Sequence, residues 1–245
     1  MRYHYLFRLP FVICLSLISP YLVSTEIKLA LTHIPQVMEY NKPNAPYTRL
    51  INTIREQSKL EFESIYLPSS RANKLLNEQK LDCIFPILPT DNRDIPTAFS
   101  VPVNGIRAHI FSVKDKPYLG LDELTGLSVV YLRGYLFGDL IKHNTQINFF
   151  PVNSQAAAFS MLKKNRANAY LDYIPDIKYA LNKKQIAELS FSEDNPVLSS
   201  FDRLECFDDE KTQAFLKVFD QQIMLLRKTG ELKNILGKYY VKTTD

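Results

Sequence analysis

Glycine and histidine are scarce in this chain, with 7 and 4 copies among 245 residues. The few glycines form no phosphate-binding loop, no dinucleotide-binding fingerprint and no Gly-x-Ser-x-Gly turn of a serine hydrolase. The histidines, at positions 4, 33, 109 and 143, are scattered without the spacing of a zinc site. The sequence therefore predicts a protein that is not an enzyme of these classes and that needs no metal or cofactor.

An excess of charge of one sign is also missing. The 30 basic and 26 acidic residues give a net charge of +4. If the first 25 residues are removed, Arg2 and Arg8 leave with them and the balance is 28 against 26. With no basic cluster along the chain, the sequence predicts no nucleic-acid partner.

The amino-terminal segment Met1–Thr25 has the order of a secretory signal peptide. Basic residues at its start are followed by an apolar stretch, Leu9–Val23, and then by Ser24 and Thr25. The alternative is an uncleaved membrane-spanning helix, but the apolar stretch is short for one. We therefore expect a mature protein that begins near Glu26 and is located in the periplasm.

Cysteine is rare, and Cys14 lies inside the apolar segment, which leaves Cys83 and Cys206 for the mature protein. An exported protein can join two such residues in a disulfide. Because they are so far apart in the sequence, two buried thiols are the simpler expectation.

Strands and helices are predicted to alternate in the first part of the mature chain. Apolar runs predict strands at Glu26–Ile34, Leu60–Leu67 and Leu81–Leu88, separated by a helix at Pro46–Lys59 and another that begins at Ser69. This order is typical of right-handed crossovers and a parallel sheet. The run Cys83–Pro89 is apolar enough for a strand that is buried on both faces.

The alternation restarts further along the chain. We predict strands at Ile106–Val113, Leu127–Leu132, Ile147–Val152 and Ala167–Asp172, and helices at Tyr135–His143, Ser154–Asn165, Ile174–Asn182, Asp209–Lys228 and Glu231–Tyr240. Two similar α/β units followed by a helical end indicate two lobes with a cleft between them.

Four segments in this order carry a resemblance to a known family. They are LDCIFPILPTDNRDIPTAFSVPV, LDELTGLSVVYLRGYLFGDLIKH, VNSQAAAFSMLKKNRANAYLDYIPDIKYAL and LLRKTGELKNILGKYY. The chain resembles the bacterial extracellular solute-binding protein family 3, the polar-amino-acid-type periplasmic binding proteins of ABC transporters. The resemblance implies a type II periplasmic binding protein fold: a signal peptide at 1–25, lobe 1 formed by 26–112 plus 197–245, lobe 2 formed by 113–196, and two crossing strands that join the lobes.

The resemblance also implies a ligand site after the third strand. Arg93 ends a Thr90-Asp91-Asn92-Arg93 turn that matches the family's carboxylate-binding arginine, and Thr90 shares the turn. A planar guanidinium suits a carboxylate because it can donate two parallel hydrogen bonds. The position agrees, since open α/β sheets bind ligands at the carboxyl ends of their strands. The alternative is that Arg93 merely pairs with Asp91 or Asp94 at the surface.

Lobe 2 has its own candidates. Gly134 and Tyr135 lie where the family has a turn that opens a helix, and free amides at such a start favour an anion. Tyr135 replaces a small hydroxyl residue, so it is either a stacking wall for a larger ligand or a residue that packs on the helix. Asp172 approximates the acidic residue that holds an ammonium group, and its alternative is a cap on the next helix. Arg71 either points into the cleft or covers the face of its helix.

We therefore expect an exported, monomeric solute-binding protein that captures a small polar, carboxylate-bearing, amino-acid-like solute for an ABC importer. Its partners would be this small-molecule ligand and a membrane ABC permease or a membrane sensor protein. The alternatives are a ligand-sensing periplasmic partner of a membrane signalling protein and, on the same fold, a dehydratase of prephenate- or arogenate-type acids.

Overall fold

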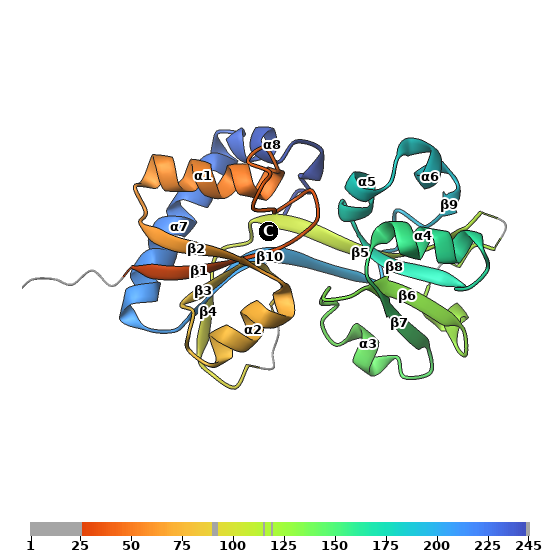
Figure 1. Ribbon diagram of the computed structural model, residues 1–245. Helices are drawn as coiled ribbons and strands as arrows, with labels where there is room; N and C mark the ends of the chain where they lie inside the picture. Colours follow the sequence, from red (N-terminus) through yellow and green to blue (C-terminus); the bar gives the residue numbers. More distant parts are fainter. Residues whose placement is uncertain (1–25, 90–92, 115, 119, 244–245) are drawn as a thin grey trace, which may run out of the picture.

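The computed structural model describes residues 26–89, 93–114, 116–118 and 120–243, and it consists of two α/β lobes (Figure 1). Two long strands, β5 (Asn104–Val113) and β10 (Leu198–Phe207), run from one lobe into the other. One continuous sheet with the order β2-β1-β3-β10-β5-β8-β6-β7 passes through both lobes. The predicted type II periplasmic binding protein fold, with two lobes and two crossing strands, is confirmed.

Lobe 1 is a sheet covered by helices on both faces. Its strands are β1 (Ile27–Thr32), β2 (Phe62–Leu67), β3 (Cys83–Ile87) and the short β4 (Thr97–Phe99), and its helices are α1 (Pro46–Ser58), α2 (Ser69–Asn77), α7 (Glu210–Lys228), α8 (Glu231–Leu236) and the 3-10 turn η2 (Gly237–Tyr239). The parallel pairing predicted for the first three strands is confirmed, because β1 lies parallel to β2 and to β3. Every residue of β3 is buried, as its apolar run predicted. Successive residues of β1 face opposite clusters: Leu31 packs with residues of α1, α7 and α8, and Ala30 packs with α2.

Lobe 2 repeats this plan with shorter helices. Its strands are β6 (Ser128–Leu132), β7 (Asn148–Val152), β8 (Ala169–Ile174) and β9 (Leu189–Ser190), and its helices are α3 (Leu140–His143), α4 (Gln155–Lys163), α5 (Asp176–Ala180), α6 (Lys183–Ala187) and the 3-10 turn η1 (Asp122–Leu124). The strand β6 lies between β7 and β8 and is parallel to both.

Two predicted helices of lobe 2 are shorter than expected. The helix expected at Tyr135–His143 begins only at Leu140, because Gly134 and Gly138 have positive φ angles of 88° and 54° and the buried Phe137 lies between them. The helix expected at Ile174–Asn182 is confined to Asp176–Ala180, since β8 continues through Ile174. Both changes alter which side chains lie near the cleft.

The crossing strands pair with each other between the lobes. Leu198 to Asp202 on β10 lie antiparallel to Ala108 to Asn104 on β5, and β10 then continues beside β3. Residues near the carboxyl end of the chain run along the same crossing: the side chain of Asn104 donates to the Tyr239 carbonyl at 3.1 Å and accepts from the Val241 amide at 2.8 Å. Ile106 and Ala108 already pack into the lobe 2 core. The boundaries after residues 112 and 196 stay a prediction.

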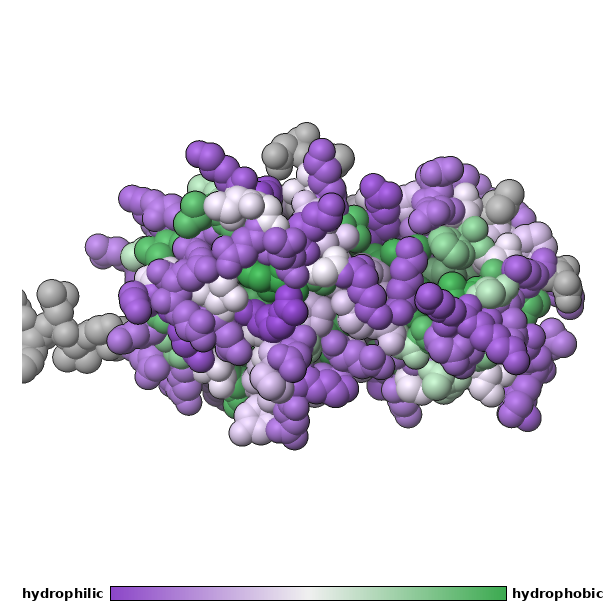
Figure 2. Space-filling model, turned by 90° about the horizontal axis from the view of Figure 1, so that it is seen from above, coloured by the Kyte–Doolittle hydropathy of each residue, from purple (hydrophilic) through white to green (hydrophobic). Residues whose placement is uncertain are grey.

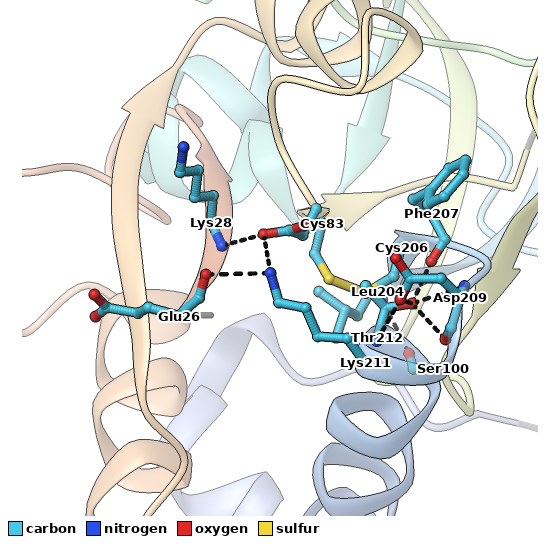
Figure 3. The surroundings of a disulfide bond; sticks show 11 residues. Glu26, Lys28, Cys83, Ser100, Leu204, Cys206, Phe207, Asp209, Lys211 and Thr212 are labelled. Carbon is cyan, nitrogen blue, oxygen red and sulfur yellow. Dashed lines mark hydrogen bonds and ion pairs between the residues drawn. A yellow bond between two sulfur atoms is a disulfide. The ribbon is translucent and has the colours of Figure 1, made fainter. Parts of the chain in front are cut away.

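The two cysteines of the described chain form a disulfide, so the expectation of two buried thiols is wrong. Cys83 on β3 lies directly opposite Cys206 on β10 in an antiparallel pair, although 123 residues separate them in sequence. The bond joins two central strands of lobe 1 (Figure 3). Beside it, the ammonium group of Lys211 on α7 lies 3.1 Å from the Asp82 carboxylate and donates to the Glu26 carbonyl.

The surface seen from above is mainly hydrophilic, with small hydrophobic patches between the polar side chains (Figure 2). Among the described residues, no helix combines the length and the apolar composition needed to cross a membrane. The predicted signal peptide, Met1–Thr25, lies outside the described residues.

Candidate ligand-binding site

A cavity of about 240 Å³ lies between the two lobes. Three segments of lobe 1 form one wall: the end of β1 (Thr32 to Pro35), the start of α2 (Pro68 and Ser69) and the end of β3 (Pro86 to Leu88). These segments meet there because parallel strands have their carboxyl ends at the same edge of the sheet. Asp202 and Ile106, from the crossing strands, also line the cavity.

The lobe 2 wall is built around the turn that follows β6. Arg133, Gly134, Tyr135 and Leu136 all line the cavity. The Arg133 amide donates to the Val152 carbonyl at 2.7 Å, which continues the β6–β7 pairing to the start of the turn. The Arg133 guanidinium donates through Nε to the Asn153 side chain at 3.1 Å, and both side chains are exposed toward solvent. An exposed guanidinium in this place can bind a carboxylate at the mouth of the cleft.

Two buried carboxyl groups line the cavity, Asp176 at the start of α5 and Asp202 on β10. The Tyr239 hydroxyl donates to Asp176 Oδ1 at 2.8 Å, and the Tyr47 hydroxyl donates to Asp202 Oδ2. Burial raises the pKa of Asp202 to about 7 and that of Asp176 to about 6, although hydrogen bonds from tyrosine hydroxyls lower both pKa values in part. A cationic group of a ligand would favour the ionised form of both carboxyl groups.

Tyrosine rings surround these carboxyl groups. Tyr135 and Tyr173 line the cavity with ring centroids 5.9 Å apart, and Tyr173 stacks on Phe137 at 4.8 Å. Tyr239 also lines the cavity and contacts the ring of Tyr47 at 5.1 Å. The site therefore combines an aromatic lining with acidic groups, and these surroundings suit an ammonium group or an apolar ligand stem.

The structure brings some of the predicted residues to this cavity and leaves others away from it. Gly134 and Tyr135 line it. The side chain of Tyr135 packs among the rings of Phe137 and Tyr173 and not on a helix. Its role as a stacking wall for a ligand stays a prediction. The helix start expected at this turn is wrong, because α3 begins only at Leu140, and anion binding at Gly134 stays a prediction. Arg71 is exposed on the first turn of α2 and does not line the cavity, and Thr90 lies outside the described residues.

Asp172 does not line the cavity. It is fully buried inside β8, so the helix cap considered from the sequence is wrong. It accepts hydrogen bonds from the Tyr170 hydroxyl and, at 2.8 Å, from the Tyr173 amide. Burial raises the pKa of Asp172 well above its ordinary value, and the nearby Asp176 raises it further. Ligand contact by Asp172 stays a prediction, whereas Asp176, four residues later, lines the cavity.

Arg93 is held away from the cavity by a buried partner. Its Nε donates to Glu205 Oε1 at 2.6 Å, a second nitrogen donates to the other Glu205 oxygen, and Nη1 donates to the Asn77 side chain at 3.0 Å. The two charged side chains are only 7% and 0% exposed. A buried carboxylate without a cation is costly, and this cost explains why Arg93 turns toward Glu205. Among the described residues, Glu205 and not Asp94 is the acidic partner of Arg93, and Asp91 lies outside the described residues. The predicted contact of Arg93 with a ligand stays a prediction.

The residues that sequence reasoning missed are Asp176, Asp202 and Arg133 as charged groups of the cleft, and Glu205 as the partner of Arg93. One signal for two of these residues was present. Asp202 and Glu205 are acidic residues of β10, and the two residues that flank Glu205, Leu204 and Cys206, are apolar and fully buried. Acidic residues at such positions indicate a buried pair or a functional site.

No protein-family model and no curated protein matches this sequence. Solved structures do match in fold. The ligand-binding core of GluR0 from Nostoc punctiforme, in complex with L-glutamate, has a TM-score of 0.73 at 16% identity, over 87% of this chain and 99% of that one. The substrate-binding protein of an amino acid ABC transporter has a TM-score of 0.68 at 15% identity, over 87% and 98%. A histidine kinase sensor domain similar to periplasmic binding proteins has a TM-score of 0.70 at 18% identity, over 88% and 96%.

These similarities establish the fold class. The chain has the two-lobed fold of periplasmic binding proteins, and this fold also occurs in ligand-binding cores and in sensor domains. At this level of identity the shared feature is the fold, and function has to be argued from the cleft itself.

Proposed function

We propose that this protein is an exported binding protein that captures a small, amino-acid-like solute between its lobes and delivers it to a membrane ABC importer. The observation that carries the proposal is the cleft, where Arg133 and the buried carboxyl groups of Asp176 and Asp202 line a single cavity. Concave sites with a few convergent polar groups in an apolar lining are typical of small-molecule binding.

The charges of the cleft complement those of an amino acid. Asp176 and Asp202 suit an ammonium group, because burial disfavours the ionised form of each carboxyl group and a nearby cation would favour it. Arg133 suits a carboxylate, since it lines the same cavity with donors that face solvent. In this proposal Arg133 takes the role that the sequence assigned to Arg93, which is occupied by Glu205.

Export is supported by two independent features. The segment Met1–Thr25 has the composition of a signal peptide. The disulfide between Cys83 and Cys206 is typical of an oxidising compartment such as the periplasm.

The test is a thermal-shift screen of the purified protein against amino acids, polyamines and organic acids. A ligand at a hundredfold excess over its Kd should stabilise the protein by about 2.7 kcal/mol. We expect an amino acid to raise the melting temperature, and we expect Arg133→Met and Asp176→Asn each to weaken its binding. Arg166→Met, at an exposed arginine of lobe 2 away from the cavity, is the matched control. If Arg133→Met and Arg166→Met bind equally well, the proposed charge pairing is wrong.

A second candidate is a periplasmic sensing partner of a membrane signalling protein, which the similarity to a histidine kinase sensor domain favours. Uptake of the labelled solute by cells with and without the gene separates the two, since only a transport component changes the rate of uptake. Mass spectrometry of the same solute after incubation detects any dehydrated product, the outcome expected of a dehydratase.

A further inference from the structure

The lobe 1 wall of the cleft contains a second polar corner, at the start of α2. Pro68 precedes this helix and has no side-chain donor or acceptor, so no side chain caps the first turn, and the first turn contains no acidic residue. The first amides of a helix have no acceptor within the helix. Those of Ser69 and Ser70 therefore have none, and Ser69 lines the cavity.

Thr32 provides an independent observation at the same corner. It lines the cavity and is only 6% exposed, and its hydroxyl has no hydrogen-bond partner within the described part of the chain. Buried hydroxyl groups normally have a partner, so an unpaired one on a residue that lines the cavity indicates a position where a polar ligand group can bind.

The register of the sheet places Thr32 next to the start of α2. Thr32 lies opposite Leu67, two residues before Ser69, and the following amide, that of His33, donates to the Leu67 carbonyl at 2.9 Å. Side chains alternate along a strand, so Thr32 is on the same face of β1 as Ala30, which packs with α2. The hydroxyl and the free amides are thus on one side of the sheet at one edge.

We propose that this corner binds a second acidic group of the solute, so that the cleft prefers an amino acid with a carboxylate on its side chain. This inference rests on the proposed function, in which Arg133 and the two aspartates hold the amino acid's own charged groups. Hydrogen-bond donors and the positive end of a helix favour an anion over a neutral amide of the same shape. No acidic side chain of the first turn of α2 competes for these donors.

The experiment compares three probes, L-glutamate, L-glutamine and L-norvaline, by titration calorimetry with the full protein. We expect L-glutamate to bind at least about tenfold more tightly than the other two, the effect of one hydrogen bond to a charged group. Thr32→Val removes the hydroxyl and keeps the branched shape. Ser69→Pro removes the first amide at a helix position that tolerates proline, after a residue whose ψ of 143° suits it. Each should reduce the L-glutamate affinity about tenfold and leave the L-norvaline affinity unchanged.

Two further variants separate this subsite from other effects. Ser69→Ala removes only the hydroxyl of Ser69, so it should reduce the L-glutamate affinity less than Ser69→Pro does. Thr97→Val, on β4 outside the cavity, is the control for the Thr32 change and should alter no affinity. Melting temperatures without ligand should be equal or higher for Thr32→Val, because that change breaks no hydrogen bond.

The outcomes distinguish the subsite from the proposed function. If L-glutamine binds as tightly as L-glutamate, or if Thr32→Val and Ser69→Pro weaken all three probes equally, the subsite is wrong and amino-acid binding still stands. If none of the three probes and no other amino acid binds the folded wild-type protein, the proposed function is overturned and the subsite with it.

Discussion

At the scale of single residues, buried partners decide what the charged side chains do. Arg93 and Glu205 form a pair that is nearly inaccessible to solvent, whereas Arg133 faces the cleft with donors available. The three aspartates near the cleft differ in the same way: Asp172 accepts from the Tyr170 hydroxyl and the Tyr173 amide, while Asp176 and Asp202 line the cavity. The residue type alone does not distinguish these roles.

Replacing Arg93 by alanine should destabilise the protein. The change leaves the Glu205 carboxylate buried without a cation, which typically costs about 3–5 kcal/mol. Urea unfolding of Arg93→Ala measures this loss, and Arg93→Met combined with Glu205→Leu should recover most of it. A folded Arg93→Ala protein with unchanged stability and no ligand binding would instead support the ligand contact predicted from the sequence.

Asp202 should make stability depend on pH. Its pKa of about 7 in the folded protein exceeds the ordinary value of 3.8, so the folded state holds the proton more tightly than the unfolded state. The stabilisation is complete below about pH 4 and is lost as the pH rises through 7, by up to about 4 kcal/mol at 1.36 kcal/mol per pKa unit. The protein without ligand should therefore be less stable at pH 8 than at pH 5 as far as this group is concerned.

Asp202→Asn removes this titration and keeps an oxygen that can accept from Tyr47. In urea unfolding, the free energy of unfolding of the variant minus that of wild type should be larger at pH 8 than at pH 5. Asp194→Asn, at an exposed position, should show the same difference from wild type at both pH values. An Asp202→Asn effect that is independent of pH would contradict the raised pKa.

At the scale of elements, β10 connects the parts of the molecule. Its first half pairs with β5 between the lobes, and its second half pairs with β3 and carries Cys206 and Glu205. Because β10 comes late in the chain, it links the amino-terminal strands to the carboxyl-terminal helices. Lobe 1 therefore folds only when the amino-terminal strands and the carboxyl-terminal helices come together.

The disulfide should contribute substantially to the free energy of unfolding of the protein. Cross-linking residues 123 apart reduces the entropy of the unfolded chain, and such bonds typically contribute about 2–5 kcal/mol. We expect the double variant Cys83→Ala, Cys206→Ala to lose a free energy of unfolding in this range, measured in urea. Ligand affinity should be unchanged, since neither cysteine lines the cavity. Equal stability of the variant and wild type would show that the bond constrains little.

At the scale of the whole molecule, two lobes share a cleft and are linked by the crossing strands β5 and β10. Tyr239 and Val241 bind the Asn104 side chain at the start of β5. Each lobe has its own cores, with helices on both faces of the sheet, so each moves more readily as a unit than it deforms. The paired segments Asn104–Ala108 and Leu198–Asp202 are the natural place for a hinge.

Ligand binding should therefore close the molecule. Small-angle scattering with a saturating concentration of the solute found in the thermal screen should give a smaller radius of gyration than the protein alone. A solute from the screen that does not bind serves as the control. An unchanged scattering profile with a confirmed ligand would mean that binding does not depend on closure.

The sequence by itself determined the secondary elements and their class. Apolar periodicity placed the strands β1, β2 and β3 and the helices between them, because burial in a parallel sheet demands a local pattern that is visible in one chain. It failed where the backbone departs from the local preference, as at Gly138, whose positive φ delays α3.

Only the tertiary structure decided which side chains meet. Glu205 is 112 residues from Arg93 in sequence, and Cys206 is 123 residues from Cys83, so no local sequence pattern predicts either pair. The facing of Asp172 and Asp176 depended on where β8 ended, since each residue of a strand reverses the direction of the next side chain. The cleft with Arg133, Asp176 and Asp202 therefore followed from the register of strands that are distant in sequence, and from the energetic need to pair each buried charge.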